Sequence, residues 1–173
     1  MIRRWIGPPL LGLLLAVAAW QATMVAVPGV LMALAVRRVS QAGAIDRFTH
    51  APLATAASRA IVRPSPDLAY SSCPFDLSKG TLLIDAVPVA APYWSLSIFD
   101  AQTNVALVRN GAAAKYQPFH IAVIAPGQAA PAGYEAISVE GRRGIALVRI
   151  LIDQRDRFPA IDQERRATTC RTG

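Results

Sequence analysis

Histidine and cysteine are scarce in this sequence, with two of each among 173 residues. Neither His50 nor His120 has a second ligand at the close spacing of a zinc site. Cys73 and Cys170 lie far apart and belong to no Cys-x-x-Cys motif. The sequence therefore predicts no metal site. It also lacks glycine-rich phosphate loops and dinucleotide fingerprints, so we expect no cofactor.

A catalytic triad has little support. Cys73, His120 and Asp67 have the side-chain types of such a triad. However, Cys73 stands directly before Pro74 in an apolar setting that disfavours a thiolate, and no G-x-S-x-G motif is present. Paired carboxylates for glycoside chemistry are equally unsupported, because the candidate acids fall at turns or strand ends: Asp67, Asp76, Asp85 and Asp100. The sequence therefore assigns no catalytic residue and favours a protein that is not an enzyme.

The two cysteines leave two alternatives open. In an oxidising compartment, Cys73 and Cys170 can form one disulfide that closes a long loop of chain. In a reducing compartment, they are small apolar side chains that suit a buried position.

Charged side chains are absent from Gly7 to Val36, which read GPPLLGLLLAVAAWQATMVAVPGVLMALAV. About twenty helical residues, at a rise of about 1.5 Å each, cross a hydrocarbon core about 30 Å thick. Trp5 fits the level of the lipid headgroups. The sequence therefore predicts a transmembrane helix within an anchor over residues 1–36, with a kink or the end of the span at Pro28-Gly29.

A cleavable signal peptide is the competing interpretation of this segment. Arg3-Arg4 resembles its basic region, Leu10 to Leu15 its apolar region, and Ala16 to Ala18 a peptidase site. The apolar run continues well past that site, which favours an uncleaved anchor. Positive residues are nearly balanced on the two sides of the run, so charge alone does not set the orientation. We expect the short N-terminal segment to stay in the cytoplasm and the following domain to be exported.

The net charge of +7 and the isoelectric point near 10.2 come from scattered arginine pairs rather than a dense basic stripe with aromatic side chains. The sequence therefore does not predict nucleic acid as a partner. Two of the pairs flank the apolar run, where arginines attract anionic lipid headgroups. The bilayer is the predicted partner of these pairs. The four pairs are Arg3-Arg4, Arg37-Arg38, Arg142-Arg143 and Arg165-Arg166.

One domain is predicted behind the anchor. Residues 37–61 are rich in alanine, with loose helical spacing and a break at Pro52, and predict a helical connector. Residues 62–173 predict a mainly β domain, an antiparallel β-sandwich, jelly-roll-like sheet or partial barrel, because short β-rich runs alternate with turn signals. The predicted strands are Leu82–Val87, Tyr93–Phe99, Val105–Val108, Phe119–Ile124, Ala136–Val139 and Ile145–Ile152.

The end of the chain predicts a C-terminal helix over residues 153–170. Asp156 has the side chain to cap its start, and Pro159 is tolerated in a first turn. Asp162 and Arg166 form an i,i+4 pair. We expect this helix to cover one end or edge of the sheet.

Polar residues that suit a cleft lie in residues 62–80, which read VRPSPDLAYSSCPFDLSKG, and in residues 100–109. Pro64 and Pro66 enforce extended backbone there, and a tight turn follows at residues 78–80. The simpler interpretation of residues 62–80 is a crossover into the sheet. The functional interpretation is a polar cleft, with the candidate residues Tyr70, Asp76, Lys79, Asp100, Thr103, Asn104 and Arg109.

The same stretches resemble the bacterial family called domain of unknown function 1254. In that family, an Arg-Pro-x-Pro-Asp-x-x-Tyr-Ser stretch leads to an Asp-Leu-Ser-Lys-Gly turn and then to an aromatic strand ending in Asp-x-x-Thr-Asn. The closing sequence RGIALVRILIDQRDRFPAID is similar to that of the family's short, membrane-anchored members. The matching stretches are Arg63 to Ser71, Asp76 to Gly80 and Tyr93 to Asn104.

The resemblance implies a β-rich fold, a place in the bacterial envelope and frequent pairing with a second domain of unknown function that this chain lacks. It supplies no agreed active site, and Cys73 stands where we expect an ordinary apolar residue. We therefore expect an inner-membrane protein whose periplasmic domain, without catalysis, binds a sister envelope protein or a lipidic ligand. The alternative is an enzyme or enzyme subunit acting on a hydrophobic envelope substrate, with the candidate site Asp76, Lys79, Asp100 and Asn104.

Overall fold

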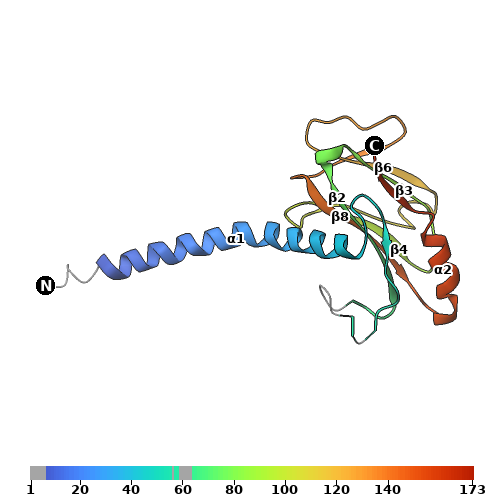
Figure 1. Cartoon of the computed structure of the whole chain (residues 1–173), viewed down its shortest axis with the longest axis horizontal. Helices are drawn as coiled ribbons and strands as arrows, with labels where there is room; N and C mark the ends of the chain where they lie inside the picture. The colour runs from blue at the N-terminus through green and yellow to red at the C-terminus, as the bar shows by residue number, and fades with distance from the viewer. Residues whose placement is uncertain (1–6, 56, 59–63) are drawn as a thin grey trace.

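The computed structural model describes residues 7–55, 57–58 and 64–173, and it shows a long helix leading into a β domain (Figure 1). The helices within these residues are α1 (Gly7–Ala42), η2 (Leu77–Lys79), η3 (Arg155–Arg157) and α2 (Phe158–Arg165). The strands are β1 (Thr49–His50), β2 (Leu68–Asp76), β3 (Leu82–Ala86), β4 (Trp94–Phe99), β5 (Val105–Asn110), β6 (Phe119–Ile124), β7 (Glu135–Ser138), β8 (Arg143–Leu151) and β9 (Thr169–Thr172).

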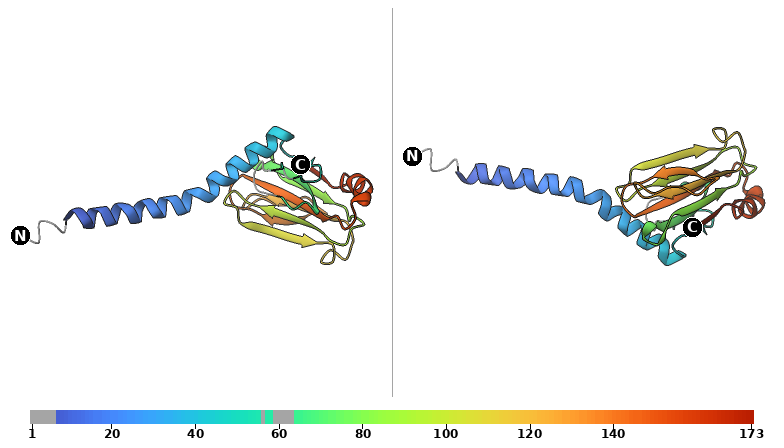
Figure 2. Two further views of the ribbon diagram at one scale, coloured as in Figure 1. Left: turned by 90° about the horizontal axis from the view of Figure 1, so that it is seen from below. Right: turned by 90° about the horizontal axis from the view of Figure 1, so that it is seen from above.

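The strands form two sheets that lie against each other (Figure 2). The first sheet has the order β1-β2-β8-β4-β5 and the second has the order β7-β6-β3-β9. The prediction of a mainly β domain is confirmed, and so are the six predicted strands. An entirely antiparallel arrangement is wrong, because β6 and β7 are parallel. The jelly-roll-like order stays a prediction.

The core lies between the two sheets. Alternation along β4 turns Trp94, Leu96 and Ile98 inward from the first sheet. Ile84 and Ile121 meet them from the second sheet, and all five side chains are buried. Burial of each such side chain is worth about 1.5–3 kcal/mol, so this layer holds the two sheets together.

The loop over residues 125–134 explains the parallel pair. It leaves the end of β6, crosses the outer face of the second sheet and enters β7 beside β6 in the same direction. On its way it packs Ala130 and Tyr134 against Leu83 and Ala122. These contacts bury the part of this outer face around Leu83 and Ala122.

The helix α1 extends far from the β domain before its C-terminal part packs on the first sheet (Figure 1). It is long and apolar enough to cross a membrane, and no residue in its most apolar part is buried. Further along, Met32 and Val36 are buried against the domain. Figure 2 shows the helix changing direction about midway, and Pro28, which lacks an N–H, lies inside it. The helix does not end at Pro28 but continues to Ala42. Residues 1–6 of the predicted anchor lie outside the described part of the chain.

The predicted helical connector over residues 37–61 is wrong for most of its length. Residues 37–42 continue α1, and residues 43–55 contain only the short strand β1. The helix ends before Gly43, where a Cβ atom would collide with the side chain of Thr49. The chain thus folds back tightly, and β1 pairs with β2. Residues 59–61 lie outside the described part of the chain.

The predicted C-terminal helix is shorter than expected. It occupies η3 and α2, while residues 169–172 form β9 at the edge of the second sheet. Pro159 lies in the first turn of α2, as predicted, and Asp162 pairs with Arg166 at 2.7 Å. Asp156 does not cap a helix, because Gln154 and Arg157 occupy the two cap positions and neither makes a side-chain capping bond.

Candidate functional site

An apolar cavity of about 560 Å³ lies between α1 and the outer face of the first sheet. Its volume falls within the range of small-molecule sites. α1, the described residues of the segment 51–64, and strands β2, β4 and β8 all contribute to its lining. We call it the apolar cavity. It is lined by Met32, Ala35, Val39, Ala51, Pro52, Ala54, Ser58, Pro64, Tyr70, Ser72, Phe99, Ile145 and Leu147.

Strand alternation places apolar side chains on this outer face. Leu147 lies beside Ser72 of β2 and Ser97 of β4, and Ile145 lies beside Phe99. Because residues of β8 alternate between faces, the neighbours of Ile145 and Leu147 along the strand point into the core instead. The outer face of a sheet usually meets water, so an apolar floor here indicates a covered surface.

A polar row borders the apolar floor. Arg149 of β8 lies directly between Tyr70 of β2 and Ser95 of β4, one row beyond Leu147. Its Nη2 donates to the Ser97 hydroxyl at 3.2 Å. The Arg149 Nε and the Ser95 hydroxyl are buried and have no hydrogen-bond partner among the described residues. Buried polar atoms normally find a partner in the protein, water or a ligand.

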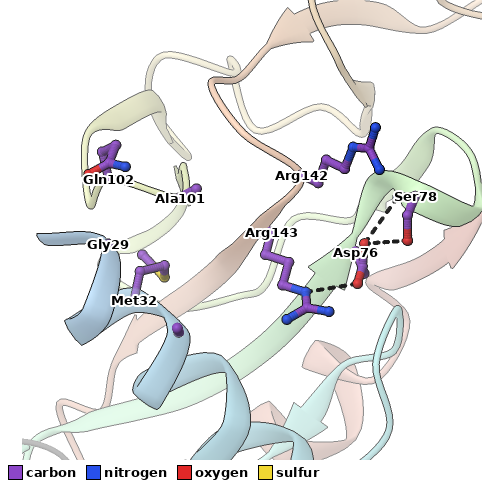
Figure 3. Close-up of a pocket in the computed structure, with 9 residues that line it drawn as sticks. Gly29, Met32, Asp76, Ser78, Ala101, Gln102, Arg142 and Arg143 are labelled. Carbon is purple, nitrogen blue, oxygen red and sulfur yellow. Dashed lines mark hydrogen bonds and ion pairs between the residues drawn. The ribbon is translucent and has the colours of Figure 1, made fainter. Parts of the chain in front are cut away.

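A second hollow, which we call the basic groove, runs along another side of α1. Two adjoining depressions of about 500 and 480 Å³ form it and share Ala33 and Arg143. Arg37 lines one depression and Arg142 lines the other, together with Gln102. In Figure 3, the guanidinium groups of Arg142, which precedes β8, and of Arg143, which begins it, point toward the Asp76 side, and Gln102 lies at the opposite side.

Asp76 holds one of these arginines in place. The Arg143 Nε donates to Asp76 Oδ2 at 2.9 Å, and the Ser78 hydroxyl donates to Oδ1 at 2.6 Å. Chiefly through the Ser78 hydrogen bond, and with a smaller contribution from Arg143, the pKa of Asp76 falls to about 2 although partial burial opposes the shift. The carboxylate therefore stays charged at neutral pH and fixes the position of Arg143.

Three of the predicted cleft residues belong to one turn between β4 and β5. The Asp100 carboxylate accepts hydrogen bonds from the backbone N–H groups of Gln102 and Asn104, both at 2.8 Å. The Asn104 amide donates to its other oxygen at 3.0 Å. Thr103 adopts a left-handed backbone with φ of 65°. Asp100, Thr103 and Asn104 are thus brought together, and Asp100 is buried in stabilising the turn.

The remaining predicted cleft residues are dispersed. Tyr70 lines the apolar cavity, Asp76 lines the basic groove, and Lys79 is exposed at the end of η2. Arg109 forms an ion pair with Glu135 at 2.7 Å between the edges of the two sheets. The seven residues therefore do not converge on one polar cleft.

A carboxylate-centred cluster on the second sheet was missed by the sequence argument. Asp85 Oδ1 lies 2.7 Å from His120 Nδ1 and accepts a hydrogen bond from the Tyr134 hydroxyl at 2.7 Å, while Arg171 pairs with Oδ2. Partial burial raises the pKa of Asp85, but hydrogen bonds from Arg171, His120 and Tyr134 outweigh it and hold the pKa well below its usual range. The direct pairing of Asp85 with His120 in the sheet brings these groups together.

This cluster resembles an acid–base dyad only in part. His120 is half exposed, and none of the hollows described above is lined by its members. Arg171 belongs to β9 and Tyr134 to the loop that covers the sheet, so the cluster ties both to β3. Within the described residues, no group of three His, Cys, Asp or Glu side chains is placed to hold a metal ion.

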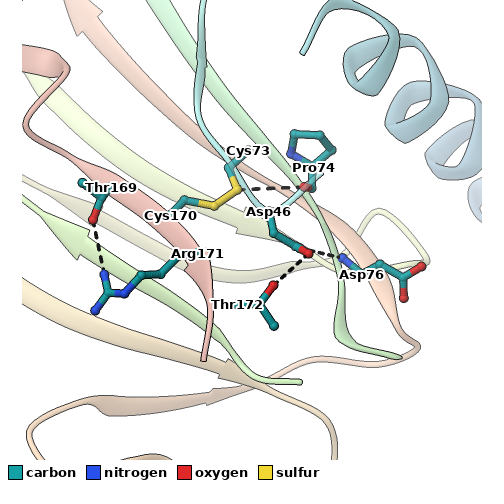
Figure 4. Close-up of a disulfide and its surroundings, with 8 residues drawn as sticks. All are labelled: Asp46, Cys73, Pro74, Asp76, Thr169, Cys170, Arg171 and Thr172. Carbon is teal, nitrogen blue, oxygen red and sulfur yellow. Dashed lines mark hydrogen bonds between the residues drawn. A yellow bond between two sulfur atoms is a disulfide. The ribbon is translucent and has the colours of Figure 1, made fainter. Parts of the chain in front are cut away.

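Cys73 and Cys170 form a disulfide that connects the two sheets (Figure 4). Cys73 lies in β2 of the first sheet and Cys170 in β9 of the second, with Cα atoms 6.7 Å apart. Nearby, Asp46 Oδ1 accepts from the Asp76 N–H at 3.1 Å and Oδ2 accepts from the Thr172 hydroxyl at 3.0 Å. The C-terminal strand is thus fastened covalently and by hydrogen bonds.

Arg165 is a buried charge that joins three segments of the chain. It lies on α2 and is only 2% exposed. Its guanidinium donates to the backbone oxygens of Ala51 and Tyr70, both at 2.8 Å, and pairs with Asp162. In the sequence, Arg165 belongs to one of the scattered basic pairs, and nothing local indicates that α2 folds back over β1 and β2.

Comparisons with known proteins identify the fold and the family. The VPA0106 protein from Vibrio parahaemolyticus is similar with a TM-score of 0.57 and 12% identity, over 63% of this chain and 28% of that chain. An uncharacterized protein from Burkholderia cenocepacia matches with a TM-score of 0.46 and 15% identity, over 64% of this chain and 32% of that chain. The chain therefore spans about a third of the length of these solved chains.

No curated protein matches it. The family model described as protein of unknown function (DUF1254) matches residues 45–172, so this chain belongs to the DUF1254 family.

Proposed function

We propose that this chain is a single-pass protein of the bacterial inner membrane whose periplasmic β domain binds a long-chain, lipid-like ligand without catalysing a reaction. α1 is the anchor, and the apolar cavity is the binding site. The observation that carries the proposal is the position of this cavity. The helix that is apolar enough to cross a bilayer also lines a cavity of about 560 Å³ in the domain.

The length of α1 supports this arrangement. Its 36 residues give a length of about 54 Å at about 1.5 Å per residue, whereas a hydrocarbon core is about 30 Å thick. If the span begins near Pro9, about twenty residues bring the chain to Gly29. Met32 and Val36, which pack on the domain, follow directly. The apolar cavity then lies just outside the bilayer surface.

The lining supports a ligand with one long apolar part and one polar end. Phe99, Ile145 and Leu147 offer apolar contact, worth about 0.8 kcal/mol for each methylene that the cavity removes from water. In the bordering row, the Arg149 Nε and the Ser95 hydroxyl lack partners. Tyr70, which lies beside Arg149 in this row and lines the cavity, marks the end at which we place the carboxylate or phosphate of the ligand.

A partner envelope protein is a second candidate. The edge strand β5 offers a place for it, because Val105 and Val108 are more than half exposed. The enzyme alternative has no comparable support, because its candidate residues lie in separate turns and hollows.

Filling the apolar cavity is expected to remove ligand binding. We expect the full chain, delipidated in detergent and offered oleic acid, to retain one molecule in native mass spectrometry. The Ala35→Trp variant places an indole in the cavity wall. Displacement of about two methylenes costs about 1.6 kcal/mol, so retention is expected to weaken by about tenfold or more.

The matched control is Leu31→Trp. Leu31 lies on the same helix, is exposed and lines none of the hollows described above. We expect it to retain oleic acid as the unaltered chain does. Equal retention by Ala35→Trp, with an unchanged thermal unfolding midpoint, would show that the cavity is not the binding site.

A further inference from the structure

The basic groove and the apolar cavity flank one line of contact between α1 and the first sheet. Met32 and Val36 are one helical turn apart and are buried along this line. Ala35 and Val39 line the apolar cavity on one side of it. Ala33 and Arg37, also one turn apart, line the basic groove on the other side. The groove is therefore a separate site from the cavity.

The groove begins where the β domain first meets α1. A Cβ atom added to Gly29 would lie 3.3 Å from the Gln102 amide nitrogen, so the turn between β4 and β5 touches the helix there. Gln102 and Arg142 line the groove together with Gly29. In the proposed topology, about twenty residues of the span precede this point, so these side chains lie at the level of the lipid headgroups.

The charges in the groove are predominantly positive. Arg37, Arg142 and Arg143 line it, and Asp76 is the acidic residue among its described lining. Asp76 accepts hydrogen bonds from Ser78 and Arg143, which leaves little of its capacity for a cation. Arg142 is exposed, and its guanidinium makes no hydrogen bond or ion pair within the described residues. A guanidinium in this setting offers a fork of N–H donors that matches a phosphate.

We infer that the basic groove binds the phosphate of an anionic phospholipid and thereby seats the β domain on the bilayer surface. The inference rests on the proposed function only in taking α1 to span the membrane. Arg142 supplies the free guanidinium, and Arg143, which Asp76 holds in position, supplies the second. Gln102 adds an amide donor at the membrane side of the groove. The net positive charge selects an anionic headgroup over a zwitterionic one.

The test is the lipid preference of the full chain in nanodiscs, measured by electron spin resonance of spin-labelled phosphatidylglycerol and phosphatidylcholine. We expect phosphatidylglycerol to associate about fivefold more strongly, and Arg142→Gln to remove most of this preference. Arg142→Lys, which keeps the charge, is expected to retain it. Arg155→Gln removes an exposed arginine of η3 that does not line the basic groove, and is expected to have no effect.

The outcomes separate this inference from the proposed function. Equal association of the two lipids with the unaltered chain, or an equal loss of the phosphatidylglycerol preference in Arg142→Gln and Arg155→Gln, would overturn the headgroup site. The proposed function would still stand in that case if Ala35→Trp weakens the retention of oleic acid. The preference for phosphatidylglycerol is also measured in inorganic phosphate and in sodium chloride of the same ionic strength. Its loss in phosphate alone would assign the groove to soluble phosphate and overturn the lipid assignment. Ala35→Trp is expected to leave the preference unchanged.

Discussion

Removal of the Cys73–Cys170 disulfide is expected to lower the free energy of unfolding of the β domain by about 2–5 kcal/mol. The bond closes a loop with a sequence separation of 97, so its loss gives the unfolded chain much more conformational freedom. The folded state also depends on it, because β9 has only four residues and pairs along one side with β3. Without the bond, the hydrogen bonds of Asp46 to Thr172 and to the Asp76 N–H remain as a link between this edge strand and the first sheet.

Urea unfolding of the full chain in detergent, followed by circular dichroism of the β signal, measures this effect. The oxidised chain, the chain with dithiothreitol and the Cys73→Ala/Cys170→Ala variant are compared. We expect the last two to unfold at similar, lower urea concentrations, and the reductant to have no effect on the double variant. Identical midpoints for oxidised and reduced chain would show that the disulfide does not stabilise the domain.

Replacement of Arg165 by methionine is expected to cost about 3–5 kcal/mol of unfolding free energy. The guanidinium is buried, and its removal takes the side-chain donor from the backbone oxygen of Ala51 and one of two donors from that of Tyr70, which still accepts from the Ala51 N–H. It also leaves Asp162 with only Arg166 as its partner. Since methionine fills much of the same volume, the loss reports on the polar contacts rather than on a cavity.

Arg166→Met is the matched control, because Arg166 pairs with the same carboxylate but is exposed. A surface ion pair of this kind contributes about 0–1 kcal/mol, so we expect a small change in the urea midpoint. A comparable loss in both variants would contradict the account, because it would assign the stability to the charge of Asp162 rather than to the buried contacts of Arg165.

The sequence predicted those elements whose signals are local. β4 alternates between apolar and other side chains, β8 is a short run rich in apolar and β-branched residues, and the long uncharged run predicts α1. β2 was interpreted as a crossover because prolines precede it and Pro74 interrupts it. β1 pairs only with Ser71 and Ser72, so β2 tolerates a residue without an N–H beyond that point.

The candidate sites depend on contacts between distant segments, which a single sequence does not display. The apolar cavity exists because the C-terminal part of α1 packs back on a sheet face that looks half polar in the sequence of β8. The cluster around Asp85 depends on the register that pairs Asp85 with His120. Asp100 and Asn104 were chosen for their polar side chains, yet these side chains stabilise a turn, which is the commonest use of such residues.

Photo-crosslinking tests the central claim most directly. The full chain in nanodiscs receives a long-chain fatty acid with a diazirine near the end of its tail, and trypsin releases residues 144–149, which contain Ile145 and Leu147 of the cavity floor. We expect irradiation to label this peptide, and Ala35→Trp to prevent the labelling while the peptide containing the membrane part of α1 is still labelled. Labelling confined to the part of α1 before Gly29 in the unaltered chain, with none at Met32, Ala35 or residues 144–149, would contradict the account, because the tail would then occupy the bilayer and not the apolar cavity.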